Sequence, residues 1–293
     1  MKKSGVWSFS ALWAISLVVA WRPLVATFSL AWRDNQYTHI LLILPVSAAL
    51  IYVEWPALKS MSAPGLRAGT VLLIVSLLAA CMLKWFLAGL QPDLRVSIAM
   101  LAVVLWWIGA FVFSFGTRVS RSLMFPLCFL FWLVPFPQVM LNAIVSFLQQ
   151  ESAVAADMLF SIAGVPVARD GVLLAIPGLT VQVAEECSSI RSSLMLLVTT
   201  MVLAQISLRS PWKKVLVIAV AVPLSVAKNA LRIFTIAMLG TRVDPSFLTG
   251  RFHHQGGIVF FLFSLLAVFV LLWILRRTEP DLLRTPQFRP AQP

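Results

Sequence analysis

The sequence is poor in charged residues, which make up 12% of its 293 positions, whereas 60% are hydrophobic. A soluble globular domain carries about 25% charged residues, so this composition excludes one. Several apolar stretches exceed about 18 residues, and a hydrocarbon core about 30 Å thick needs roughly 20 helical residues to cross. Alternating segments of about ten residues, the signature of a membrane β-barrel, do not dominate. The sequence therefore predicts an all-α integral membrane protein.

Cysteine and histidine are also scarce, with three residues of each. Three cysteines give no even disulfide framework. Cys81 and Cys128 lie inside apolar runs, where a free thiol behaves as a small hydrophobic group. No H-E-x-x-H motif occurs, and the adjacent His253 and His254 lack the i,i+4 spacing that puts two zinc ligands on one helix face. We therefore expect no metal site and no cofactor.

The basic residues are not gathered into one stripe, which argues against nucleic-acid binding despite a net charge of +12. They lie mainly in short loops between apolar runs, the pattern that orients membrane proteins with their basic loops inside. With the N-terminus inside, the inner loops hold 13 of the 23 basic residues: Lys2, Lys3, Lys59, Arg67, Arg118, Arg121, Arg209, Lys213, Lys214, Arg276, Arg277, Arg284 and Arg289. The first apolar run is expected to be a retained span, because no A-x-A-like cleavage site follows it.

Eight transmembrane helices are predicted, with both termini on the cytoplasmic side. They lie near Val6–Ala31, Thr38–Val53, Ala68–Leu90, Val96–Phe115, Leu123–Leu141, Ser188–Leu208, Val215–Leu239 and Gly257–Leu275. We expect a single multi-pass domain over residues 1–277 and a loose cytoplasmic tail over residues 278–293.

A short extracytoplasmic layer is predicted between the fifth and sixth spans. The two prolines of "LVPFPQVM" remove backbone donors and should break the helix there. The residues that follow, to about Gly164, indicate an amphipathic helix along the outer surface. Asp170-Gly171 and Pro177-Gly178 are turn signals between β-prone runs, so we expect a β-hairpin that leads to Cys187.

A polar cluster stands where this hairpin meets the sixth span, in the segment "VAEECSSIRSS". Ser188 or Ser189 is a natural cap for the helix that follows. A thiol in the first helical turn feels the positive end of the helix dipole, which favours the reactive thiolate, so Cys187 is the candidate nucleophile. Glu186 and Ser188 flank it as candidate supporting residues. The alternative is an inert cysteine beside ordinary capping serines.

The seventh span contains "VAKNALRIF", in which Lys228 and Arg232 share a helix face and Asn229 is adjacent. Charges inside a span are costly and usually face the bundle interior or water. Arg232 is 19 residues beyond Lys213 in the sequence, roughly 29 Å along a helix, which puts it near the outer surface, level with Cys187. The alternative for Arg232 is a side chain that extends to the lipid headgroups.

His253 and His254 precede the eighth span in "GRFHHQGGIVFF", at the same membrane face. Successive helical side chains diverge by about 100°, so one histidine should face the site. A purely structural histidine is the alternative for each. A cysteine, an arginine and a histidine together fit nucleophilic acyl transfer, in which a thiolate attacks a carbonyl, a cation stabilises the oxyanion and an imidazole moves protons.

These motifs resemble the exosortase/archaeosortase family of multi-pass membrane cysteine transpeptidases or proteases. "ECSSIRSS", "NALRI" and "HHQGGIVFF" occur in the family order, and "YTHILLILP" and "VPFP" are also similar to family features. Ser189 differs from the Gly that is commoner there. The resemblance implies that Cys187 and Arg232 are catalytic. The family histidine lies four residues before the Gly that opens the final span, so Gly257 assigns His253 and leaves His254 at a variable position.

The resemblance also implies a substrate class and a location. The substrates would be exported proteins with a C-terminal sorting signal of the PEP-CTERM kind, made of a Pro-Glu-Pro-like motif, a membrane helix and a basic tail. Cleavage would occur near that motif at the outer face of the bacterial inner membrane, often alongside exopolysaccharide production. An acyl-thioester on Cys187 would be the intermediate. Lys228, Asn229, Glu186 and Ser188 remain candidate supporting residues.

Two other functions fit parts of the sequence. A transporter would use Lys228 and Arg232 to line an anion pathway, although no paired broken helices in matching halves are apparent. A membrane glycan or lipid transferase linked to exopolysaccharide export would use basic residues to hold phosphates. Cys187 separates these functions from acyl transfer, because a transporter or a metal-independent transferase should often tolerate its loss.

Overall fold

The computed structural model describes residues 3–58, 63–85, 89–183, 190–249 and 257–279. These residues are mostly α-helical with one small antiparallel sheet, so the predicted all-α membrane fold is confirmed. They form two compact units, which meet in the sequence between Met140 and Leu141 and are described separately. The single domain expected over residues 1–277 stays a prediction.

Among the described residues, six helices are long and apolar enough to cross a membrane: Asn35–Pro56, Leu66–Leu83, Pro92–Phe115, Ile190–Ser207, Pro211–Arg242 and Gly257–Arg277. Two further helix pairs pass the same test but are bent by 76° and 98°. The number of spans reaches the predicted eight if each bent pair is one span. The chain is therefore a multi-pass membrane protein.

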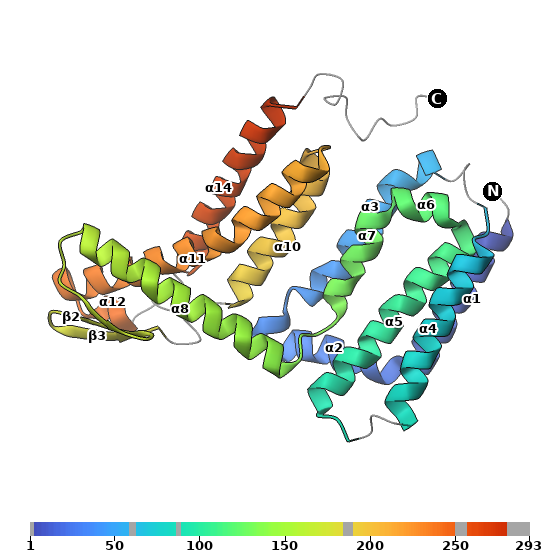
Figure 1. Cartoon of the computed structure of the whole chain (residues 1–293), viewed down its shortest axis with the longest axis horizontal. Helices are drawn as coiled ribbons and strands as arrows, with labels where there is room; N and C mark the ends of the chain where they lie inside the picture. The colour runs from blue at the N-terminus through green and yellow to red at the C-terminus, as the bar shows by residue number, and fades with distance from the viewer. Residues whose placement is uncertain (1–2, 59–62, 86–88, 184–189, 250–256, 280–293) are drawn as a thin grey trace. The chain divides into compact units, whose positions relative to one another are not determined.

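The first unit packs around one central helix. Its elements are α1 (Lys3–Val19), α2 (Trp21–Arg33), η1 (Asn35–Tyr37), α3 (Ile40–Leu58), α4 (Leu66–Trp85), α5 (Pro92–Phe115), α6 (Thr117–Ser122), α7 (Met124–Phe129) and η3 (Leu130–Leu133). α5 contacts α1, α2 and α4, and α4 and α5 run side by side (Figure 1). A Cβ on Gly69 would lie only 2.4 Å from the Cα of Phe113, so glycine allows α4 and α5 to approach closely.

The first predicted span, Val6–Ala31, is corrected to two helices. α1 ends at Val19, α2 begins at Trp21, and the pair is bent by 76°. Pro23 lies in the first turn of α2. Proline has no N–H for the carbonyl four residues earlier and its ring crowds that carbonyl, so the helix does not continue straight.

The break predicted at the prolines of "VPFP" is confirmed. η3 ends at Leu133, α8 (Gln138–Ile162) follows, and the two segments are bent by 98°. Side chains of the first unit bond to the broken backbone: Tyr37 Oη donates to Phe136 O at 3.0 Å, Ser97 Oγ donates to Pro135 O at 2.8 Å, and Asp93 Oδ2 accepts from Gln138 N at 2.8 Å. Backbone groups that leave the helix pattern thereby keep partners, as a membrane interior requires.

The second unit contains most of α8, a small sheet and a helical bundle. Its other elements are β1 (Ala168–Asp170), β2 (Leu173–Ile176), β3 (Leu179–Gln182), α10 (Ile190–Ser207), α11 (Pro211–Arg242), α12 (Ser246–Thr249) and α14 (Gly257–Arg277). The strands form one antiparallel sheet in the order β1-β2-β3. Gly171 and Gly178 occupy the two turns with φ of 58° and 82°. The predicted hairpin is therefore confirmed, with a third strand added.

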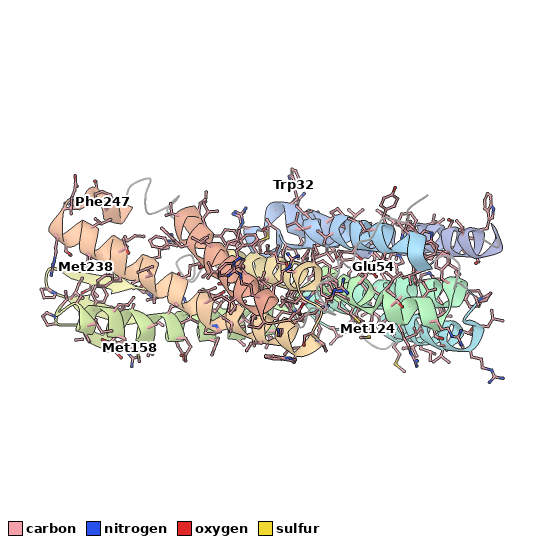
Figure 2. The ribbon with its side chains drawn as sticks, turned by 90° about the horizontal axis from the view of Figure 1, so that it is seen from above. Trp32, Glu54, Met124, Met158, Met238 and Phe247 are labelled. Carbon is pink, nitrogen blue, oxygen red and sulfur yellow. The ribbon has the colours of Figure 1, made fainter. Side chains whose placement is uncertain are left out.

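The sheet packs against α8 and the second half of α11. Leu174 and Ile176 of β2 are buried while their neighbours are exposed, as a strand with one covered face requires. They share a core with Phe160 of α8 and Ile233 of α11. On its other side α8 exposes apolar residues such as Met158, which Figure 2 labels. The predicted amphipathic helix is thus present, and its position along the outer membrane surface stays a prediction.

α10, α11 and α14 pack together as a three-helix bundle (Figure 1). α11 follows α10 after a short turn and runs back along it. Lys213, at the start of α11, donates to Leu275 O at the end of α14, so α14 is also antiparallel to α11. The starts of α10 and α14 therefore lie at the same end of the bundle, beside the second half of α11.

Candidate functional site

The candidate site is carried by α11, the longest described helix. Pro211 occupies its first turn, where no helical N–H is lost, and the helix continues through Pro223 to Arg242. Its 32 residues extend about 48 Å, well beyond a hydrocarbon core of about 30 Å. One end of α11 is therefore long enough to leave the membrane and pack with α8 and the sheet.

Lys228 connects α11 to the first turn of α10. Its side chain is buried, with 6% exposed, and its Nζ donates to Ser192 Oγ. Ser192 is the third residue of α10. The ammonium group therefore lies beside the positive end of the α10 dipole, where a cation is electrostatically unfavourable unless an anion or a polar group balances it.

Asn229 connects α11 to α8. Its Nδ2 donates to Ser152 Oγ at 2.9 Å, and both side chains are almost completely buried. The Oδ1 of Asn229 has no hydrogen-bond partner among the residues that the structure describes. The hydrogen bond from the buried Asn229 amide to Ser152 fixes the rotation of α11 against α8. The neighbouring charged residues are thereby kept facing the bundle.

Arg232 connects α11 to the first residue of α14. It is 9% exposed, and a Cβ placed on Gly257 would lie 3.8 Å from Nη1 of Arg232. The guanidinium group is therefore in van der Waals range of the start of α14. Since Lys228 is four residues earlier on the same face, two cations and two positive helix ends gather in one corner of the bundle. This arrangement can stabilise a negative charge that forms or binds there.

The other predicted site residues are Cys187, Glu186, Ser188, His253 and His254, and all of them lie outside the described residues. Their proposed roles stay predictions. His39, the third histidine, is buried in the first unit, with its ring 6.1 Å from that of Trp132. The structure buries the side chains of Lys228, Asn229 and Arg232 on α11, and their roles in the site stay predictions.

The two serine partners were not identified as such from the sequence. Ser192 belongs to the "ECSSIRSS" segment, so the sequence motif already indicated that this serine lies close to the site. Ser152 had no comparable signal, because a single serine on a helix is common and its partner is 77 residues away. Among the described residues no group of three or more His, Cys, Asp or Glu side chains is placed to hold a metal ion.

Comparison with known proteins identifies the family. The model of the transmembrane exosortase family matches residues 31–270, which include every element from α3 to α12 and most of α14. No curated protein and no solved structure matches the chain. The matched region contains α11 with its buried Lys228, Asn229 and Arg232. The chain therefore belongs to the transmembrane exosortase family.

Proposed function

We propose that the protein is a membrane-embedded cysteine transpeptidase or protease that cleaves exported proteins at a C-terminal sorting signal of the PEP-CTERM kind. Membership of the exosortase family supports this function. The observation that carries it is the position of Arg232, a buried guanidinium group beside the first residue of α14 and one helical turn from the contact with α10.

The sequence connects the other proposed catalytic residues to the same two helix starts. Cys187 precedes the first residue of α10 by three positions, and His253 precedes the first residue of α14 by four. Consecutive Cα atoms are about 3.8 Å apart, so links of these lengths span at most about 11 Å and 15 Å. A cysteine, an arginine and a histidine are therefore assigned to one site.

The chemistry proceeds through two acyl transfers. The thiolate sulfur of Cys187 attacks the carbonyl carbon of the scissile peptide bond, and the carbonyl oxygen takes the negative charge. Arg232 donates hydrogen bonds to this oxyanion from its planar guanidinium group. The carbon–nitrogen bond then breaks, and His253 gives a proton to the departing amine. An amine or water then attacks the resulting thioester and gives its proton to His253, which releases the product and restores the Cys187 thiolate and the protonated histidine.

The length of α11 supports an active site at the outer face of the bacterial inner membrane. Lys213 and Lys214 stand at the start of α11, and basic residues of this kind are typical of the cytoplasmic side. A span of about 30 Å takes roughly 20 residues, which brings Arg232 to the opposite face. The sheet and the end of α11 then lie outside the membrane, where an exported protein would be accessible.

Arg232→Lys tests this assignment. We expect the processing rate of a substrate with a sorting signal to fall at least roughly 100-fold, because a lysine ammonium does not reproduce the planar donors that face the oxyanion. Arg242→Lys is the matched control, since Arg242 is an exposed residue at the end of the same helix. Wild-type processing by a correctly inserted Arg232→Lys protein would remove Arg232 from the mechanism.

A further inference from the structure

A second buried cation on α11 has no part in the acyl-transfer steps. Lys228 is four residues from Arg232, which is about 6 Å along the helix axis. Its Nζ donates to Ser192 Oγ, which is a neutral partner. No carboxylate of the described residues lies within salt-bridge distance of Lys228. The position therefore holds a buried positive charge whose described partner does not neutralise it.

The surroundings of Lys228 raise the cost of this charge. A buried ammonium group is unfavourable unless it is paired, and Arg232 adds a second positive charge one turn away. Ser192 lies in the first turn of α10, at the positive end of the helix dipole. Gly257, beside Arg232, is likewise the first residue of α14. An anionic ligand would give Lys228 the counter-charge that its described partner does not supply.

We propose that Lys228 binds the carboxylate of an acidic side chain of the peptide substrate, close to the scissile bond. This inference rests on the proposed function, in which Arg232 marks the position of the scissile carbonyl. The 6 Å between the two helix positions corresponds to about two residues of an extended peptide at about 3.3 Å per residue. The acidic residue is therefore within two positions of the bond that is cut.

A side chain of the substrate fits this position better than a lipid phosphate. Lys228 is buried among helices and lies one turn farther along α11 from the end that carries the sheet than Arg232 does. A single acidic side chain brings less bulk to such a position than a phospholipid phosphate, which carries its glycerol and two acyl chains with it. In the sorting signal proposed above, the glutamate of the Pro-Glu-Pro-like motif is the acidic residue.

The test compares peptides that differ in one side chain, using purified full-length protein in vesicles. The substrate peptide carries Glu, Gln or Lys at the acidic position. Wild-type protein is expected to process the Glu peptide at least roughly tenfold faster than the Gln peptide. The Gln peptide offers Lys228 no charged partner. Lys228→Met, which keeps the length of the side chain, should process both at one rate. Lys228→Glu should prefer the Lys peptide.

Lys214→Met is the control, since it removes a positive charge from the other end of α11, where Lys214 bonds to Gln205. It should keep the wild-type preference. If Lys228→Met loses all turnover, the affinities of the Glu and Gln peptides are compared in Cys187→Ala protein with and without Lys228→Met. The proposal requires the difference in affinity to disappear with the lysine.

A Lys228→Met protein that keeps the wild-type ratio of Glu to Gln peptide overturns the proposal, and so does wild-type protein that does not discriminate. A preference that follows the phosphatidylglycerol content of the vesicles, and not the peptide, assigns the site to a headgroup and overturns it as well. Failure of the proposed function would give a different result, because Cys187→Ala protein would then still process every peptide.

Discussion

The C-terminal end of α14 and the start of α11 cap each other, and this contact makes a quantitative prediction. Glu279 is 4% exposed, and its Oε1 accepts from the backbone N–H groups of Arg209 at 2.9 Å and Ser210 at 3.1 Å. Ser210 is the residue that precedes α11. The carboxylate thus lies at the positive end of the α11 dipole, where an acidic group is stabilising.

Lys213 provides the reciprocal contact. It is 5% exposed, and its Nζ donates to Leu275 O and to Thr278 Oγ1, each at 3.0 Å. These groups belong to the negative end of the α14 dipole, where a cation is stabilising. The two contacts hold the ends of α11 and α14 together at the side of the bundle opposite Arg232.

Glu279→Ala should therefore destabilise the protein substantially. A hydrogen bond to a charged group contributes about 1.5–3 kcal/mol, and two are lost, but water reaches the freed N–H groups in part, so we expect about 2–4 kcal/mol. At about 2–4 °C per kcal/mol, the melting temperature should fall by roughly 4–16 °C. Glu279→Gln keeps an oxygen acceptor, so its melting temperature should fall by about half as much.

Thermal unfolding in detergent, followed by the fluorescence of the 11 tryptophans, measures these changes. Glu151→Ala is the matched control, because it removes an exposed carboxylate from α8. The expected order of melting temperatures is wild type and Glu151→Ala together, then Glu279→Gln, then Glu279→Ala. Equal melting of Glu279→Ala and Glu151→Ala would show that the caps contribute nothing to stability.

Two further predictions concern topology and the histidines. Reporter fusions should indicate the cytoplasm after Lys59, Arg121, Lys214 and Arg277 and the outside near Asp170 and Asp244, because basic loops stay inside. A cytoplasmic reading near Asp170 would place the start of α10 in the wrong compartment. His253→Ala should nearly abolish processing, roughly a 10²–10⁴-fold loss for an acid–base group, whereas His254→Ala should be mild. The reverse ranking would give the role to His254, and full activity of the double variant would remove histidine from the mechanism.

Hydropathy predicted where helices occur better than how they bend. The predicted span Val96–Phe115 ends where α5 ends, because a long apolar run has few other solutions in a membrane. The bend after Val19 was missed, since a hydropathy average does not register the N–H that Pro23 lacks. The break at "VPFP" was predicted because two prolines in three residues leave no room for a continuous helix.

The charged half of the candidate site was predictable, and its partners were not. Lys228 and Arg232 stand out in the sequence because ionised groups are rare inside spans. Their burial toward α10 and α14 follows from the i,i+4 spacing on one face. Ser152 and Ser192 were not predictable as partners, because hydrogen bonds across 77 and 36 residues depend on how the helices pack. The third strand of the sheet similarly depends on tertiary contact with the second half of α11.

The nucleophile is tested most directly by trapping the acyl intermediate on Cys187. Purified protein is mixed with a sorting-signal substrate, and the reaction is quenched in acid and digested with a protease. The mass of the peptide that contains Cys187 is then measured by mass spectrometry. We expect an adduct equal in mass to the acyl part of the substrate, which hydroxylamine removes, as a thioester requires. The Cys187→Ala protein should insert normally, form no adduct and leave the substrate uncleaved. Cleavage by Cys187→Ala at the wild-type rate would contradict cysteine catalysis.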